Sequence, residues 1–101
     1  MQIRLMPFFQ EFADSVMTGK EYGLFRVQAI ALAHEKDRTR HFEKVIKAPD
    51  RVIVVNYYLS FKLNTLFVLT AHIQRGGEPR DKEKQALHKY FEELKALEGE
   101  A

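Results

Sequence analysis

The positions of apolar residues predict a short strand and a helix at the start of the chain. Residues 2–6, QIRLM, have the composition of a short strand. Pro7 suits the first turn of a helix, because its missing N–H needs no partner there. Apolar residues then recur at helical spacing and form one stripe: Phe8, Phe9, Phe12, Ala13 and Val16. Glycine is a frequent C-cap residue, so we expect this helix to end at Thr18 and Gly19.

A second helix is predicted from about Glu21 to Arg38, with a charged end at residues 34–40. One of its faces is formed by Phe25, Ala29, Leu32 and Ala33. This apolar face is widened by Leu24, Val27, Ile30 and Ala31. A helix that is apolar over so much of its circumference is usually buried on more than one side, and we expect the same here.

Three strands follow, at residues 41–47, 51–61 and 65–74. The middle one, RVIVVNYYLSF, is rich in β-branched and aromatic residues on both faces, which is typical of a central strand. The connections are short, at residues 48–50 and 62–64, so we expect an antiparallel meander.

The last helix is predicted from near Pro79 to about Leu97, followed by a mobile acidic tail at residues 98–101. Its apolar stripe consists of Ala86, Leu87, Tyr90, Phe91, Leu94 and Leu97. The complete order is β-α-α-β-β-β-α. We therefore predict one α+β domain over residues 1–101, with a small antiparallel sheet packed against helices.

Composition excludes several classes of protein. The sequence has no cysteine, and its four histidines lack the paired spacing of a metal site, so neither a metal nor another cofactor is expected. No apolar stretch is long enough to cross a bilayer, and the N-terminus lacks the pattern of a signal peptide. Together these features indicate a cytoplasmic protein. The formal net charge of +2 permits binding to nucleic acid without requiring it.

The meander brings cationic residues together at one end of the predicted sheet. The first strand ends and the second begins at this end, and the third strand returns to it. The residues gathered there are Lys47, Arg51, His72, Arg75, Arg80 and Lys82. Lysine and arginine bind phosphate, and histidine can act as a general acid or base near neutral pH. Such a group can cleave RNA without a metal, because the RNA supplies its 2′-hydroxyl as nucleophile.

The same residues also have an interpretation without function. Strand ends are normally polar, and lysine and arginine are ordinary surface residues. His72 alternates with Val68 and Thr70, so it can be a half-buried histidine with satisfied hydrogen bonds. Gly76 and Gly77 would allow close approach of a ligand, but they also fit a simple turn.

The second half of the chain resembles the RelE/ParE/HigB-type toxins of bacterial and phage toxin–antitoxin systems, and most of all their phage-derived HigB-like branch. That branch typically has a "YRVFYF"-like strand, a strand ending in "LLHxFxKK", and a helix of the pattern "PxxExxxAxxRxxxY". The corresponding segments here are DRVIVVNYYL, TLFVLTAHIQRGGEP and RDKEKQALHKYFEELK. Ile73 occupies the F position, and Gln74 and Arg75 occupy the KK positions. The resemblance covers residues 41–97 with motifs and the earlier residues only in element type.

This resemblance implies a RelE-like fold and a metal-free, ribosome-dependent mRNA endonuclease that is neutralised by a cognate antitoxin. It implies that Arg51 and Arg75 contact the phosphate in the transition state, with Lys47 and His72 as nearby catalytic helpers. We further expect Lys44, Arg80 and Lys82 to bind RNA. Other functions stay open: a gyrase-directed ParE-like toxin or a small phage inhibitor that is not an enzyme, and a plain RNA-binding module.

Overall fold

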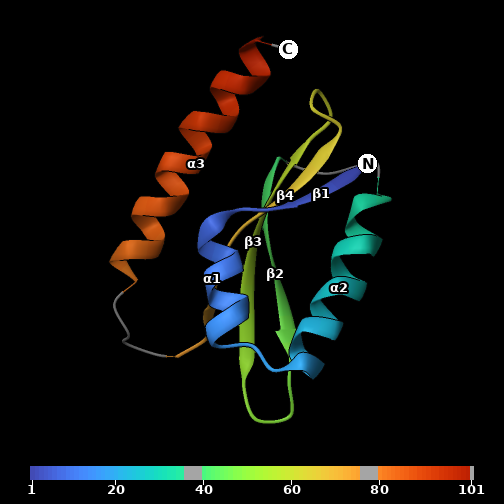
Figure 1. The fold of residues 1–101 in the computed structure, drawn as a ribbon, viewed down its shortest axis with the longest axis vertical. Helices are drawn as coiled ribbons and strands as arrows, with labels where there is room; N and C mark the ends of the chain where they lie inside the picture. Colours follow the sequence, from blue (N-terminus) through green and yellow to red (C-terminus); the bar gives the residue numbers. More distant parts are fainter. Residues whose placement is uncertain (36–39, 76–79, 101) are drawn as a thin grey trace.

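The protein forms one four-stranded sheet with helices on both faces (Figure 1). The computed structural model describes residues 1–35, 40–75 and 80–100. The elements are β1 (Gln2–Leu5), α1 (Pro7–Ser15), α2 (Gly19–Ala33), β2 (His41–Lys47), β3 (Val52–Ser60), β4 (Thr65–Ile73) and α3 (Asp81–Glu100). The predicted α+β class and the order β-α-α-β-β-β-α are therefore confirmed.

The strand order in the sheet is β1-β4-β3-β2. The meander of β2, β3 and β4 is antiparallel, as predicted. The sheet as a whole is mixed, however, because β1 pairs with β4 in parallel, from Gln2 opposite Thr65 to Leu5 opposite Val68. The prediction of an all-antiparallel sheet was wrong, since the first strand enters the sheet beside the last and not beside its neighbour in sequence.

Each face of the sheet has its own apolar core. Phe9, Phe25 and Leu32 of α1 and α2 pack on one face against Val55 and Tyr57. Tyr90 and Leu94 of α3 pack on the other face with Tyr58, Phe67 and Leu69. Figure 1 shows α3 and α2 on opposite sides of the strands. Because β3 and β4 are covered on both faces, they read as continuous apolar runs in the sequence.

A β-bulge interrupts the pairing of β3 with β4. Asn56 pairs with Thr70, but the next residue, Tyr57, pairs with Val68, so Leu69 has no partner in the register. A residue inserted in this way places two successive side chains on the same face of a sheet. Leu69 packs in the α3 core, and Thr70 contacts Glu83 of α3.

The junction between α1 and α2 differs from the prediction. Gly19 is the first residue of α2, not the C-cap of α1, which ends at Ser15 with Val16 as its C-cap. Thr18 and Glu21 form a capping box: the Thr18 hydroxyl accepts from the Glu21 N–H at 3.1 Å, and the Glu21 carboxylate accepts from the Thr18 N–H at 2.9 Å. The Thr-x-x-Glu spacing that specifies this box is present in the sequence.

Helix α2 ends at Ala33, with His34 as its C-cap, so the predicted extension to Arg38 was wrong; residues 36–39 lie outside the described residues. The apolar face predicted to be covered on a second side is also exposed. The exposed fractions of Leu24, Val27 and Ile30 are 42%, 70% and 49%. Only the face that carries Phe25 and Leu32 packs on the sheet.

Helix α3 continues to Glu100, which contradicts the predicted mobile tail for residues 98–100; Ala101, like the predicted helix start at Pro79, lies outside the described residues. Glu98 is buried, and its carboxylate accepts hydrogen bonds from Tyr58 at 2.6 Å and Ser60 at 2.8 Å. Arg40 approaches the same carboxylate at 3.3 Å. Burial alone would raise the pKa of Glu98, but these partners together lower it. The end of the helix is thereby fixed to β3.

Candidate functional site

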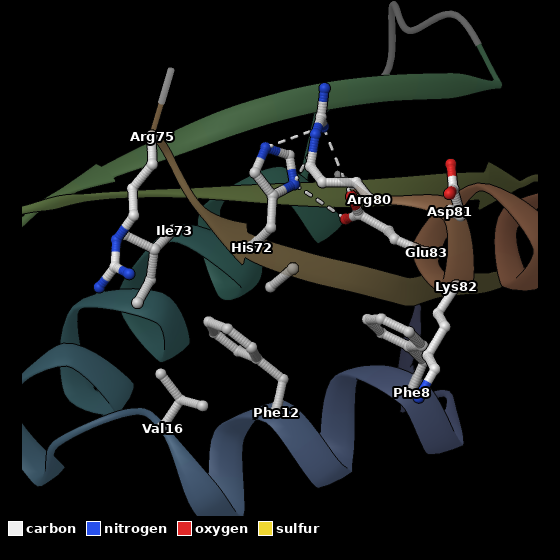
Figure 2. Close-up of a pocket in the computed structure, with 11 residues that line it drawn as sticks. Phe8, Phe12, Val16, His72, Ile73, Arg75, Arg80, Asp81, Lys82 and Glu83 are labelled. Atoms are coloured by element: carbon white, nitrogen blue, oxygen red, sulfur yellow. Dashed lines mark hydrogen bonds and ion pairs between the residues drawn. The ribbon is translucent and has the colours of Figure 1, made fainter. Parts of the chain in front are cut away.

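His72, Glu83 and Arg80 form a hydrogen-bonded group between the end of β4 and the start of α3 (Figure 2). The Nδ1 atom of His72 lies 2.9 Å from Oε2 of Glu83. Nη1 of Arg80 lies 3.0 Å from Nε2 of His72 and 3.4 Å from Oε1 of Glu83. The Glu83 side chain is 4% exposed, the His72 side chain 16% and the Arg80 side chain 44%.

These contacts define the proton positions on a neutral His72. Nη1 of Arg80 lies 3.0 Å from Nε2 and 3.3 Å from Nδ1, so it does not distinguish the two ring nitrogens, whereas the Glu83 carboxylate next to Nδ1 can only accept. Nδ1 then carries the proton and donates it to Glu83. A carboxylate at Nδ1 fixes the ring orientation and stabilises the imidazolium that forms if Nε2 takes up a proton. The arrangement therefore prepares Nε2 to act as a base once the Arg80 side chain moves away from it.

A buried hydrogen-bond chain holds Glu83 in place. The Thr70 hydroxyl donates to Oε2 of Glu83 at 2.8 Å, and the Asn56 amide donates to the Thr70 hydroxyl at 3.2 Å. Oδ1 of Asn56 lies 3.2 Å from Nε2 of His41. Asn56 and Thr70 are almost fully buried, so both would be costly to leave without partners. The chain crosses β2, β3 and β4 and ends at α3, which ties the position of His72 to the sheet.

The group borders a cavity of about 510 Å³ between α1, the end of β4 and the start of α3. Its walls on the α1 side are apolar and include Phe8, Phe12 and Val16. Figure 2 shows these three side chains pointing from α1 toward β4, with Arg75 and Lys82 at opposite ends of the opening. The cavity lies in the size range of ligand pockets, and it combines an apolar floor with cations at its rim.

Four of the predicted site residues thus meet at this cavity: His72, Arg75, Arg80 and Lys82. Arg51 does not. Its guanidinium forms two hydrogen bonds to Glu21, at 2.6 and 2.7 Å, and a third to the Val16 carbonyl at 2.9 Å. Hydrogen bonds with Arg51 lower the pKa of Glu21 to about 2, and Glu21 in turn raises the pKa of Arg51. These hydrogen bonds of Arg51 join the β2–β3 turn to the start of α2.

Lys47 and Lys44 lie outside the cavity lining. Lys47 is exposed, and it pairs with Val52 in the β2–β3 ladder, so its side chain lies on the same face of the sheet as His72. Lys44 pairs with Val55, whose side chain belongs to the core under α2, so Lys44 faces the opposite side of the sheet from His72. RNA binding by Lys44 stays a prediction, but Lys44 does not share a face of the sheet with His72.

The sequence interpretation missed Glu83, Asn56 and Thr70. A signal for Glu83 was present, because it lies on the helical stripe that continues through Leu87, Tyr90 and Leu94. A carboxylate on an apolar stripe is buried and needs a partner. Asn56 in an apolar strand gave a similar signal. Gly76 and Gly77 lie outside the described residues.

Comparison with models of known protein families gives no match, and comparison with curated proteins gives no significant match either. Within the described residues, no group of three or more histidine, aspartate or glutamate side chains could hold a metal ion. None of the helices in the described part of the chain combines the length and apolar content needed to span a bilayer.

Proposed function

We propose that the protein is a metal-free endoribonuclease of the RelE/HigB-like toxin type, with His72 as its general base. The observation that carries this proposal is the position of His72. Its Nδ1 is held by the buried Glu83, and His72 lines a cavity together with Arg75, Arg80 and Lys82. Histidine beside several cations is suited to phosphodiester chemistry.

In the proposed reaction, an RNA phosphate in the cavity binds Arg80 and draws it away from Nε2 of His72. Nε2 then takes the proton of the 2′-hydroxyl, whose oxygen attacks the adjacent phosphorus. The bond from phosphorus to the 5′-oxygen breaks, and the proton on His72 passes to that oxygen. The products are a 2′,3′-cyclic phosphate and a 5′-hydroxyl, so atoms and charges balance without a metal. Glu83 stabilises the imidazolium between the two proton transfers.

The toxin class is supported by the resemblance of residues 41–97 together with the β-α-α-β-β-β-α order. On this proposal the fold is RelE-like, the substrate is mRNA on the ribosome, and a cognate antitoxin neutralises the protein in the cytoplasm. The resemblance assigned the phosphate contact in the transition state to Arg51. We assign it to Arg80 instead, because the guanidinium of Arg51 is already hydrogen-bonded to Glu21 and the Val16 carbonyl. Arg75 and Lys82 contact flanking phosphates.

The test is induced expression in bacteria, with growth and mRNA integrity followed together. We expect growth arrest with cleavage of translated messages, and loss of both in His72→Gln. His88→Gln is the matched control, because His88 is a highly exposed histidine away from the cavity. Arrest with intact messages would contradict the proposal and favour a gyrase-directed toxin. Normal growth, with salt-dependent RNA affinity but no cleavage, would favour a plain RNA-binding module.

A further inference from the structure

Within residues 1–35, 40–75 and 80–100, the outer edge of β4 carries main-chain groups that have no hydrogen-bond partner. The Gln74 N–H donates to the Val52 carbonyl at 2.8 Å. In an antiparallel ladder this makes Ile73 and Ile53 a non-hydrogen-bonded pair, so the N–H and C=O of Ile73 point away from β3. Ala71 has the same orientation, two residues earlier. None of the described residues forms a main-chain hydrogen bond with these outward groups.

This edge is open because β1 stops early. Its pairing with β4 ends at Leu5 opposite Val68, and the last contact is the Met6 N–H donating to the Val68 carbonyl at 2.9 Å. Pro7 then starts α1, which leaves the plane of the sheet. The place beside Ala71 and Ile73, where a longer β1 would continue, is the cavity described above, and both residues line it.

The walls of the cavity define what an added strand must look like. Side chains of a strand alternate between the two faces of a sheet. On one face they would meet Phe12 and Val16 of α1, which are apolar. On the other face they would meet His72 and Arg80. The rim of the cavity has more exposed cations than exposed acids: it includes Arg75, Arg80 and Lys82 but only Asp81 as an exposed acid.

We propose that this edge binds an extended segment of a partner protein in which apolar and acidic residues alternate. The segment adds a strand to β4, takes its main-chain hydrogen bonds from Ala71 and Ile73, and places its acidic side chains on the Arg80 side. Because it covers His72, binding of the segment and of RNA exclude each other. This exclusion rests on the proposed function, whereas the binding itself does not.

The probe is a fluorescein-labelled peptide of nine residues in which glutamate and valine alternate. Its control is a peptide of the same composition with the glutamates in one block, which has equal charge but cannot divide its side chains between two faces. We expect the alternating peptide to bind more tightly, measured by fluorescence anisotropy without RNA. We also expect it to slow amide hydrogen exchange at Ala71 and Ile73, measured by NMR.

The decisive variant is Ile73→Pro, compared with Ile73→Ala. Both remove the isoleucine side chain, but only proline removes the outward N–H, and this N–H takes no part in the β3 ladder. We expect Ile73→Pro to weaken peptide binding about tenfold relative to Ile73→Ala, the effect of one main-chain hydrogen bond. Circular dichroism checks that both variants are folded. Should Ile73→Pro unfold, the exchange data on the unmodified protein still decide the question.

Three results would overturn the proposal. One is equal binding of the two peptides, which would mean simple charge attraction. Another is protection of amides elsewhere and not at Ala71 and Ile73. The third is concentration-dependent self-association that protects the same amides without peptide, which would make a second copy of this chain the occupant. Since no RNA is present in these measurements, a protein that cleaves no RNA can still pass them.

Discussion

Two arginine–glutamate pairs lie at the same end of the sheet and differ in nearly every structural respect. In both pairs the glutamate is buried, with a side-chain exposed fraction of 5% for Glu21 and 4% for Glu83. Arg51 binds Glu21 through two nitrogens at 2.6 and 2.7 Å. Arg80 reaches Glu83 only at 3.4 Å, and His72 takes the other carboxylate oxygen at 2.9 Å.

The two pairs differ in whether the arginine still has donors available for a ligand. The short, bidentate pair satisfies both charges within the protein, and the Val16 carbonyl takes a further donor of Arg51. The longer pair leaves Arg80 44% exposed and contacts His72, which lines the cavity. Residue type is therefore a poor guide to the role of an arginine at this sheet end. What separates them is whether a carboxylate already saturates the guanidinium.

The largest expected effect is on RNA cleavage and comes from a change at His72, beside the longer pair of Arg80 and Glu83. We expect His72→Gln to lower the rate of RNA cleavage by roughly 10²–10⁴-fold, the usual contribution of a general acid–base group. The rate is scaled to the folded fraction of the variant, because His72 is only 16% exposed and its Nδ1 is a partner of the buried Glu83. Cleavage of a labelled RNA by purified protein in the presence of ribosomes measures the rate. Arg51→Gln serves as the control: once scaled to the folded fraction, its rate should match the parent.

A second prediction concerns the bidentate pair of Arg51 and Glu21, where a substitution should lower the stability of the fold. Glu21→Gln keeps a side-chain oxygen for the Thr18 N–H but removes the charge that Arg51 binds. We expect a free energy of unfolding lower by roughly 1–3 kcal/mol, the range for hydrogen bonds to charged groups. Urea unfolding followed by circular dichroism measures it. An unchanged midpoint would mean that Arg51 is not held by this pair in solution.

The stabilisation that the Arg51–Glu21 pair contributes should also decrease as the pH falls. The pKa of Glu21 is lowered to about 2 from an ordinary value of 4.5, with the hydrogen bonds from Arg51 as the largest cause. The unfolded chain therefore binds its proton first as pH falls, so the stabilisation is present above pH 4.5 and declines toward pH 2. We expect the difference in unfolding free energy between the parent and Glu21→Gln to shrink over this interval. A constant difference would contradict the lowered pKa.

The smallest expected effect is at His88 and Glu92, which form an exposed pair at 3.1 Å on α3. Their side chains are 78% and 71% exposed, so solvent screens the interaction. We expect His88→Gln to leave both RNA cleavage and the urea midpoint unchanged within error. A clear loss of activity in this variant would show that the cavity at His72 is not the only surface that matters.

The order of elements was predictable from the sequence because strands and helices here have clear periods and short connections. The meander also brought His72, Arg75, Arg80 and Lys82 to one end correctly. The parallel place of β1 was not predictable, since a four-residue strand carries no signal of its partner. The role of Arg51 depended on Glu21, which is 30 residues away in sequence. The pattern along the chain predicts which residues lie at one end of the sheet. It does not predict which of their charges pair with one another.

The bulge at Leu69 gives β4 a spare residue. Without it, Val68 and Thr70 would still face Tyr57 and Asn56, and those two pairs would simply become consecutive. A shortened strand without Leu69 would therefore keep His72 on the same face, at the cost of one apolar side chain under α3. In a regular strand, removing any single residue turns every later side chain to the other face. The strand β4 can thus lose this one residue without turning His72 to the other face of the sheet.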